Sequence, residues 1–203
     1  MASFFSYDNP VWKFIGNLAD FFLLSLIWLI CSLPIVTMGA ASTALYYVTL
    51  KMAENKEGRL LPAFFTSFRQ NLKQGSLIWL GFLLAGSLIG FDLLWASQQG
   101  TLIATAMFVT FAIIGVIYAC CLSFVFVVLA RCDNTVSAIF KMSCGMVIRN
   151  FPAVLAGVVV YAGFFLVGAF LFWPLLLVAP ALPAYLNSFL YNRILAKYDL
   201  SLT

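Results

Sequence analysis

The run from Ile15 to Leu50 constrains this chain more than any other stretch, because it contains no Lys, Arg or Glu. At about 1.5 Å per residue, a helix over Ile15–Val36 is long enough to cross the roughly 30 Å hydrocarbon core of a bilayer. Pro34 lacks a backbone donor and Gly39 lacks a side chain, so we expect the helix to break between Leu33 and Gly39. The sequence therefore predicts a membrane span followed by a turn.

Similar apolar runs recur along the chain, over Gly75–Ala96, Leu102–Ala130 and Ala153–Leu195. The last run is too long for one crossing, and we divide it at Phe172-Trp173-Pro174, where Trp suits the membrane interface and Pro suits a helix start. Of the whole chain, 64% of residues are hydrophobic and 9% are charged, against about 25% charged in a soluble domain. We therefore expect residues 1–203 to form one all-α domain, a polytopic transmembrane helix bundle.

The stretch Ala40–Met52 decides whether the bundle has five or six spans, because it can be a short returning span or an amphipathic continuation. With six spans, all eleven Lys and Arg residues fall on one side of the membrane. The positive-inside rule makes that side cytoplasmic, together with the C-terminus. With five spans only Lys13 lies outside, so the rule prefers six. The net charge of +4 then indicates contact with anionic lipid and not nucleic-acid binding, because the cations flank spans and form no single patch.

Two basic segments between spans have the pattern of amphipathic helices, and we expect both to lie along the cytoplasmic membrane surface. In the segment Lys51–Lys73, the apolar residues that share one helical face are Leu61, Phe64, Phe65, Phe68 and Leu72. In the segment Arg131–Asn150, the corresponding residues are Val136, Ile139, Phe140, Cys144, Val147 and Ile148.

These two segments also resemble each other. The sequence A-F-F-T-S-F-R-Q-N from Ala63 and the sequence A-I-F-K-M-S-C-G-M-V-I-R-N from Ala138 each lead into a span. An internal repeat explains this, and so do two amphipathic helices of similar composition without duplication.

Three polar residues within the apolar runs are candidate functional groups. Asn17 and Asp20 lie three residues apart, hence on one face at the start of the first span, and Asp92 lies near the outer end of its span. An ionisable residue inside a membrane is costly, which makes it a functional candidate by default. The structural alternative is that Asp20 reaches the interface or a backbone partner and that Asp92 is solvated.

Helix breakers and small residues mark further positions. Pro34 with Gly39, and Pro180 with Pro183, interrupt the first and last spans. Interrupted spans expose backbone groups to substrate in transporters, whereas the simpler interpretation is that they bend helices and shape the bundle.

The pair Gly86-x-x-x-Gly90, supported by Gly81, allows another helix to approach closely. It fits packing inside the bundle, and it also fits a homodimer contact.

Enzyme signatures are missing from the sequence. There is no His, no G-x-S-x-G, no glycine-rich phosphate loop with Lys and no acidic cluster for a metal. The five cysteines form no C-x-x-C pair, so we interpret them as small hydrophobic residues. We expect no catalytic residue, no metal and no cofactor.

The run G-N-L-A-D-F-F-L-L-S-L-I-W-L-I-C-S-L-P-I-V-T-M-G-A-A-S-T-A-L-Y-Y-V-T-L-K, followed by F-F-T-S-F-R-Q-N-L-K-Q-G, resembles the YesL-like bacterial membrane proteins, a family named for a domain of unknown function. The likeness covers nearly the whole chain and is strongest over Tyr7–Gly75. The resemblance implies a multi-pass protein of the bacterial plasma (inner) membrane, often encoded beside sugar-importing ABC permeases. It supplies no catalytic residues.

This resemblance and the absent catalytic groups together suggest a non-catalytic accessory protein in carbohydrate uptake, with a membrane permease or a second copy of the chain as its partner. The alternative is a small transporter or channel that uses the interrupted spans and Asp20.

Overall fold

Every element of regular structure in the described part of the chain is a helix, so the fold is all-α as the sequence predicts. The computed structural model describes residues 10–56, 58–171, 176 and 178–198, with side chains from residue 18 onward. The helices are α1 (Pro10–Ser32), the short 3-10 helix η1 (Ile35–Thr37), α2 (Met38–Ala53), α3 (Leu60–Gln70), α4 (Leu72–Ser97), α5 (Leu102–Leu129), α6 (Val136–Arg149), α7 (Phe151–Phe170) and α8 (Ala181–Ala196).

Three of these helices, α4, α5 and α7, are long and apolar enough to cross a membrane. They correspond to the apolar runs predicted over Gly75–Ala96 and Leu102–Ala130 and to the first part of the run that starts at Ala153. Most of their side chains point away from the rest of the protein, since only 11% of the most apolar window of α4 and 17% of that of α7 are buried. Such faces are suited to lipid and not to water.

The first predicted span ends earlier than the sequence suggested. Helix α1 ends at Ser32 and not at Val36, because the residue before a proline disfavours the helical conformation and Pro34 itself is extended, with φ −74° and ψ 108°. The hydroxyl of Thr37 donates to the carbonyl oxygens of Cys31 at 2.6 Å and of Pro34 at 2.8 Å. These two bonds stabilise the turn that leads into α2.

Helix α2 is the centre of the fold. It contacts α1, α3, α4, α5 and α8, and Ala40, Ala41 and Ala44 on it are completely buried. A helix that lay on the membrane surface would keep one polar face exposed. The stretch Ala40–Met52 is therefore an internal helix, and the interpretation as an amphipathic continuation does not fit.

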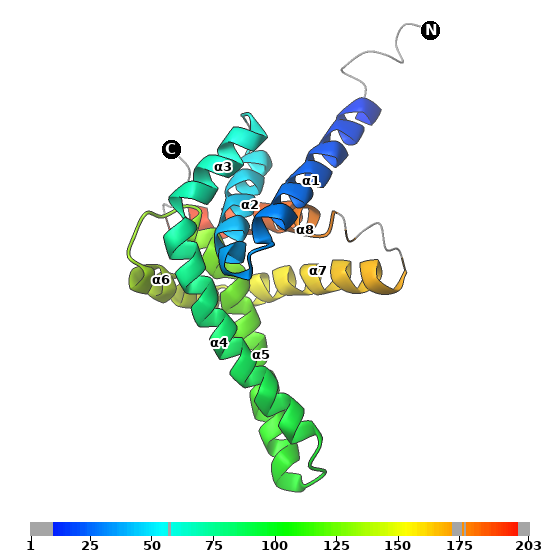
Figure 1. Cartoon of the computed structure of the whole chain (residues 1–203), viewed down its shortest axis with the longest axis vertical. Helices are drawn as coiled ribbons and strands as arrows, with labels where there is room; N and C mark the ends of the chain where they lie inside the picture. Colours follow the sequence, from blue (N-terminus) through cyan, green and yellow to red (C-terminus); the bar gives the residue numbers. More distant parts are fainter. Residues whose placement is uncertain (1–9, 57, 172–175, 177, 199–203) are drawn as a thin grey trace, which may run out of the picture.

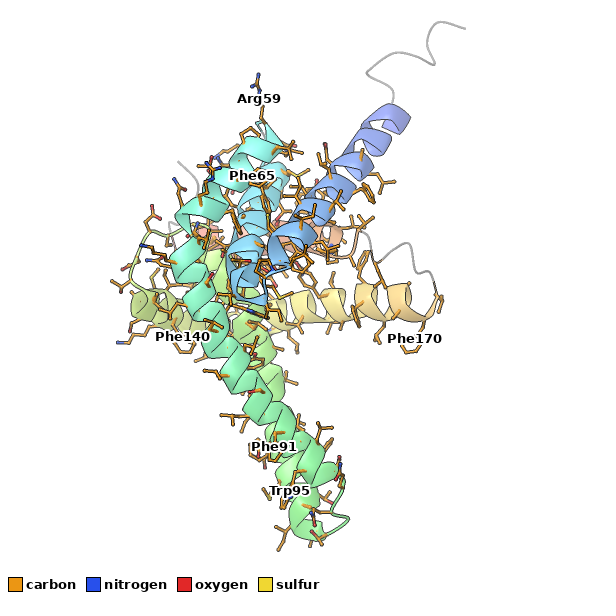
Figure 2. All side chains as sticks on the ribbon, viewed as in Figure 1. Arg59, Phe65, Phe91, Trp95, Phe140 and Phe170 are labelled. Atoms are coloured by element: carbon orange, nitrogen blue, oxygen red, sulfur yellow. The ribbon has the colours of Figure 1, made fainter. Side chains whose placement is uncertain are left out.

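The long helices do not all run parallel. Figure 1 shows α4 and α5 side by side as a hairpin that projects away from the other helices, while α7 leaves the centre in another direction. Gly100, with φ +57°, lies in the connection between α4 and α5, where glycine tolerates this conformation. In Figure 2, Phe91 and Trp95 lie toward the tip of the hairpin and Phe170 lies at the far end of α7.

Helices α3 and α6 each bury one row of side chains and expose others. On α3, Phe64 is fully buried, whereas Leu61 and Phe65 are about two-fifths exposed. On α6, Ile139 is fully buried and Phe140 is half exposed; Figure 2 shows Phe65 and Phe140 on these two helices. The predicted apolar faces are thus divided between the core and the outer surface.

The last span predicted from the sequence is not confirmed, because α8, the helix in its place, has 16 residues and is not among the described helices that are long and apolar enough to cross a membrane. Residues 172–174, where we placed the break, lie outside the described residues, but α7 ends at Phe170 and α8 begins at Ala181. Pro180 is the residue that precedes α8, and Pro183 lies in its first turn. Prolines are tolerated there because the first backbone donors of a helix have no partner within it. Pro180 and Pro183 therefore start a helix and do not bend one.

Candidate binding cavity

A cavity of about 610 Å³ lies where the helices converge. Its wall is formed by the end of α1, the start of α2, one turn of α4, the second half of α5, the middle of α7 and the segment that leads into α8. The volume is within the range of small-molecule sites, roughly 300–1,000 Å³. Six aromatic residues line it: Trp28, Tyr46, Trp79, Phe126, Tyr161 and Phe165.

The break at Pro34 forms one wall of this cavity. Because the chain reverses between Ser32 and Met38, the end of α1 and the start of α2 lie against each other. The indole Nε1–H of Trp28 donates to the hydroxyl oxygen of Ser42 at 3.2 Å, which joins the two helices beside the cavity.

Two glycines bring α4 to the opposite side of α2. A Cβ atom placed on Gly75 would lie 2.8 Å from the backbone nitrogen of Ala40 and 2.9 Å from its Cα. A Cβ atom on Gly39 would overlap the carbonyl oxygen of Gly75 and lie 2.7 Å from Cβ of Trp79. The close approach of the two backbones therefore requires both glycines, and it sets the position of Trp79 in the cavity wall.

Several polar side chains of the wall have partners within the protein, whereas the buried indole N–H of Trp79 has none among the described residues. Trp28 bonds to Ser42, and Tyr46 and Tyr161 are hydrogen-bonded to each other. The hydroxyl of Ser123 donates to the carbonyl oxygen of Cys120 at 3.0 Å. No described residue in the wall is charged. The cavity therefore presents hydrocarbon and aromatic surface, with little free hydrogen-bonding capacity.

A second polar arrangement lies away from the cavity, where α2, α5 and α8 end. A guanidinium nitrogen of Arg131 donates to a carboxylate oxygen of Glu54 and to the amide oxygen of Asn192, each at 2.6 Å. The amide nitrogen of Asn192 donates to the carbonyl oxygen of Leu50 at 3.0 Å. The Arg131 side chain is 1% exposed, so this cluster is a buried connection between helices.

Other polar contacts at the same end join the remaining basic segments. The side chain of Gln74 donates to the backbone oxygen of Asn134 at 3.0 Å, and that of Asn150 donates to the Tyr198 hydroxyl at 3.3 Å. The start of α4, the loop before α6, the start of α7 and the end of α8 therefore meet at one end of the molecule.

The intramembrane polar residues predicted from the sequence lie on two helices, α1 and α4. Asp20 lies on α1 and is partly exposed, and it does not line the cavity. Asn17 also lies on α1, but its side chain is outside the described part. Asp92 lies on α4 in the projecting hairpin, 13 residues beyond Trp79 and thus about 20 Å farther along the helix.

The predicted packing glycines of α4 have different surroundings. A Cβ on Gly86 would lie 2.5 Å from the Tyr118 hydroxyl oxygen of α5, and that hydroxyl donates to the carbonyl oxygen of Phe82 at 2.7 Å. A Cβ on Gly81 or Gly90 would meet no atom within 4 Å. Within the chain, only Gly86 of the three allows a close helix contact.

Pro34 and Gly39, expected to act together as a break, also differ. Pro34 lies between the two helices, whereas Gly39 lies inside the first turn of α2. The described residues contain no group of three or more His, Cys, Asp or Glu that could hold a metal ion.

Sequence reasoning missed the residues that form the cavity wall and those that form the Arg131–Glu54 cluster. Trp28, Ser42 and Tyr161 lie in apolar runs that give no sign of a cavity, because these residues are far apart in the sequence and come together only in the folded protein. The signal that was available is the occurrence of Trp and Tyr inside spans, since their polar groups need partners when buried. Likewise, Arg131 directly after an apolar run could have been paired with Glu54, the acidic residue that follows α2.

The helical fold, with three helices able to cross a membrane and apolar faces exposed on each, defines an integral membrane protein. Residues 21–93 match the family described as Protein of unknown function, DUF624. The YesL-like proteins form this family, so the match confirms the resemblance inferred from the sequence. No curated protein and no solved structure significantly matches the chain.

Proposed function

We propose that this chain is a non-catalytic accessory protein of the bacterial plasma membrane that acts together with a carbohydrate-importing ABC permease. The YesL-like resemblance supports the link to carbohydrate uptake. The α4–α5 hairpin is the structural observation that carries the accessory role, because Leu84, Leu88 and Phe91 on it are each about two-thirds exposed. An exposed apolar face of this kind can pack against a partner helix within the bilayer.

Photo-crosslinking in the native host tests the accessory role. A photoreactive phenylalanine analogue is placed at Leu88 on the hairpin, and as a control at Leu102, where α5 begins beyond the hairpin turn. We expect the Leu88 variant to form a covalent adduct with a permease subunit and the Leu102 variant to form much less. An adduct of two copies of this chain identifies a homo-oligomer contact, and either that result or no protein adduct at all contradicts the permease proposal.

We further propose that the C-terminus and the basic loops lie in the cytoplasm, with α3 and α6 along the inner membrane surface. The polar contacts of Arg131, Gln74 and Asn150 support this arrangement, because they join the basic segments at one end. The turn of the α4–α5 hairpin, which contains no Lys or Arg, is at the other end of the two helices. The contact between Gly39 and Gly75 does not support the sixth crossing expected from the sequence, because it holds the start of α2 beside the basic start of α4.

Cysteine labelling tests this topology in a variant without native cysteines. An impermeant maleimide added to intact cells should label Gln99→Cys in the hairpin turn but not Leu33→Cys in the break after α1. It should label Ser137→Cys on α6 only after the membrane is permeabilised. Labelling of Leu33→Cys in intact cells would instead favour six crossings, and labelling of Ser137→Cys in intact cells would reverse the orientation.

A transporter or channel is the second candidate function. It is favoured by the position of the cavity beside the break at Pro34, since interrupted helices form substrate sites in transporters. Vesicles that contain the purified protein should then show flux of sugar or ions. If that flux is lost in Asp20→Asn, Asp20 belongs to the mechanism; unchanged flux removes it.

A further inference from the structure

Trp79 is a residue of the cavity wall whose polar group has no partner. Its indole Nε1–H is buried and makes no hydrogen bond with any described residue. The ring lies beside that of Phe126, another wall residue, with the two ring centroids 6.5 Å apart. The start of the side chain is held against α2, because a Cβ on Gly39 would lie 2.7 Å from Cβ of Trp79. Since a buried indole N–H normally has an acceptor, this donor indicates a group that a bound molecule supplies.

The wall has a second group that is able to donate. The Ser42 hydroxyl accepts from Trp28 at 3.2 Å, and a hydroxyl oxygen that accepts can still donate its own hydrogen. The Ser123 hydroxyl, by contrast, already donates to the carbonyl oxygen of Cys120 at 3.0 Å. No described wall residue carries a charge. The cavity therefore offers a few donors to a neutral molecule.

These properties disfavour two classes of occupant. A sugar carries several hydroxyl groups, and each of them needs partners that this wall does not have in sufficient number. A plain hydrocarbon fills the space but leaves the Trp79 donor unpaired, at the full cost of a buried polar group without a hydrogen bond. A molecule with carbonyl oxygens and no O–H or N–H of its own satisfies that donor and brings none that needs an acceptor.

The shape of the occupant follows from the aromatic side chains. Six aromatic residues line the cavity, and aromatic rings pack well against the face or edge of another flat ring. A volume of about 610 Å³ is in the range of sites that hold a drug-sized molecule.

From this geometry we propose that the cavity binds an uncharged, flat ring compound with carbonyl acceptors and no donors, which is the chemistry of a quinone. One carbonyl oxygen accepts from the indole Nε1–H of Trp79, and the ring lies among the aromatic side chains of the wall. This inference does not depend on the permease or transport proposals.

The test measures binding to the full chain in nanodiscs, with empty nanodiscs as the background for partition into lipid. The probe is radiolabelled 2,3-dimethyl-1,4-naphthoquinone, whose two methyl groups block the ring carbons that thiols attack. The matched probe is 2,3-dimethylnaphthalene, which has the same rings and methyl groups but no carbonyl. We expect saturable binding of the quinone. After correction for lipid, its dissociation constant should be about three- to tenfold lower than that of the hydrocarbon, the range for one hydrogen bond.

The variant Trp79→Phe keeps an aromatic ring in the wall and removes the N–H. It should weaken quinone binding about three- to tenfold and leave hydrocarbon binding unchanged, since only the quinone accepts from the indole. Trp95→Phe is the matched control, because Trp95 is an exposed residue of the same helix outside the wall. It should change neither affinity.

Filling the cavity locates the bound molecule. Ala119→Phe places a ring in the cavity and should abolish saturable binding of both probes. Ala106→Phe should leave binding unchanged, because Ala106 is an exposed residue of the same helix outside the wall. If Ala119→Phe does not fold, Val158→Phe fills the cavity from α7 and should give the same loss.

Four outcomes overturn the proposal. If saturable binding is absent, or if it persists in a folded cavity-filling variant, the cavity is not a site for the quinone. Equal affinities of the parent protein for the two probes would show apolar filling without recognition of the carbonyl, and this comparison needs no variant. An equal loss of both probes in Trp79→Phe would give the indole a packing role only.

Discussion

The contact between Gly39 and Gly75 allows a quantitative test of how α2 and α4 pack. In Gly75→Ala, the new methyl group would lie 2.8 Å from the nitrogen and 2.9 Å from the Cα of Ala40. Ordinary contacts between such atoms are about 3.5–4.0 Å, so the two helices must separate by roughly 0.7–1 Å. Both clashing atoms belong to the backbone of the central helix, which cannot rotate away as a side chain can.

We expect this separation to cost about 1–3 kcal/mol of unfolding free energy, the usual range for overpacking. The higher helix propensity of alanine offsets up to about 1 kcal/mol of this cost. The controls are Gly81→Ala and Gly90→Ala on the same helix, where the added Cβ meets no atom within 4 Å. These variants gain the propensity without the clash, so they should be as stable as the parent protein or slightly more stable.

The measurement is thermal unfolding in a mild detergent, followed by tryptophan fluorescence. For a domain of this length about 1 kcal/mol corresponds to roughly 2–4 °C, so Gly75→Ala should unfold about 4–10 °C below both controls. If Gly75→Ala unfolds at the same temperature as Gly81→Ala, the two backbones are not in contact and the placement of α4 against α2 is wrong.

Two further predictions concern the end of the molecule with the basic loops. Arg131→Met should cost about 1–3 kcal/mol, because it removes the hydrogen bonds of the guanidinium to Glu54 and Asn192, while Glu54 keeps Lys56 at 3.5 Å; the loss should shrink when Glu54→Gln is added, and equal losses in the single and double variants would contradict the pairing. Burial, with a smaller contribution from the adjacent Asp133, raises the pKa of the Cys132 thiol. In a variant that retains only Cys132, alkylation by iodoacetamide should therefore rise with pH through a midpoint above that of free cysteine, and a lower midpoint would refute the burial.

The helices could be predicted from the sequence where neighbouring residues along the chain determine them. The apolar runs that start at Gly75 and Leu102 became α4 and α5, because the length of an uncharged segment determines whether it can cross a bilayer. The effect of Pro34 was also predictable, since a proline acts on its own backbone and on the residue before it. Pro180 and Pro183 were misjudged because the effect of a proline depends on where its helix begins, which the apolar pattern did not specify.

The cavity could not be predicted, because it is formed by residues that share no local pattern. Trp28 and Tyr161 are separated by more than 130 positions and meet only after α1, α2 and α7 have packed. The roles of the glycines could not be predicted either. The spacing of Gly81 and Gly90 is typical of packing residues, but a Cβ on either would meet no atom within 4 Å, whereas Gly39 and Gly75 form the contact between α2 and α4. A glycine's role is set by the helix opposite, and one sequence does not show which helix that is.

The resemblance between the segments that begin at Ala63 and Ala138 extends to the joints that end them. Helices α3 and α4 meet at Asn71, and helices α6 and α7 meet at Asn150. Each asparagine directs both its backbone N–H and its side-chain amide to the carbonyl oxygen four residues earlier, Ser67 in one case and Met146 in the other, at 2.9–3.0 Å.

These two hydrogen bonds to one carbonyl oxygen end a helix and satisfy an acceptor that would otherwise lack a partner. It allows the chain to pass directly from a helix with one buried face to a helix suited to the bilayer, without a loop. Similar amphipathic composition alone does not require an asparagine at the joint or this pattern of bonds. The shared joint therefore favours an internal repeat of an amphipathic helix, an asparagine and a span over chance similarity of the two segments.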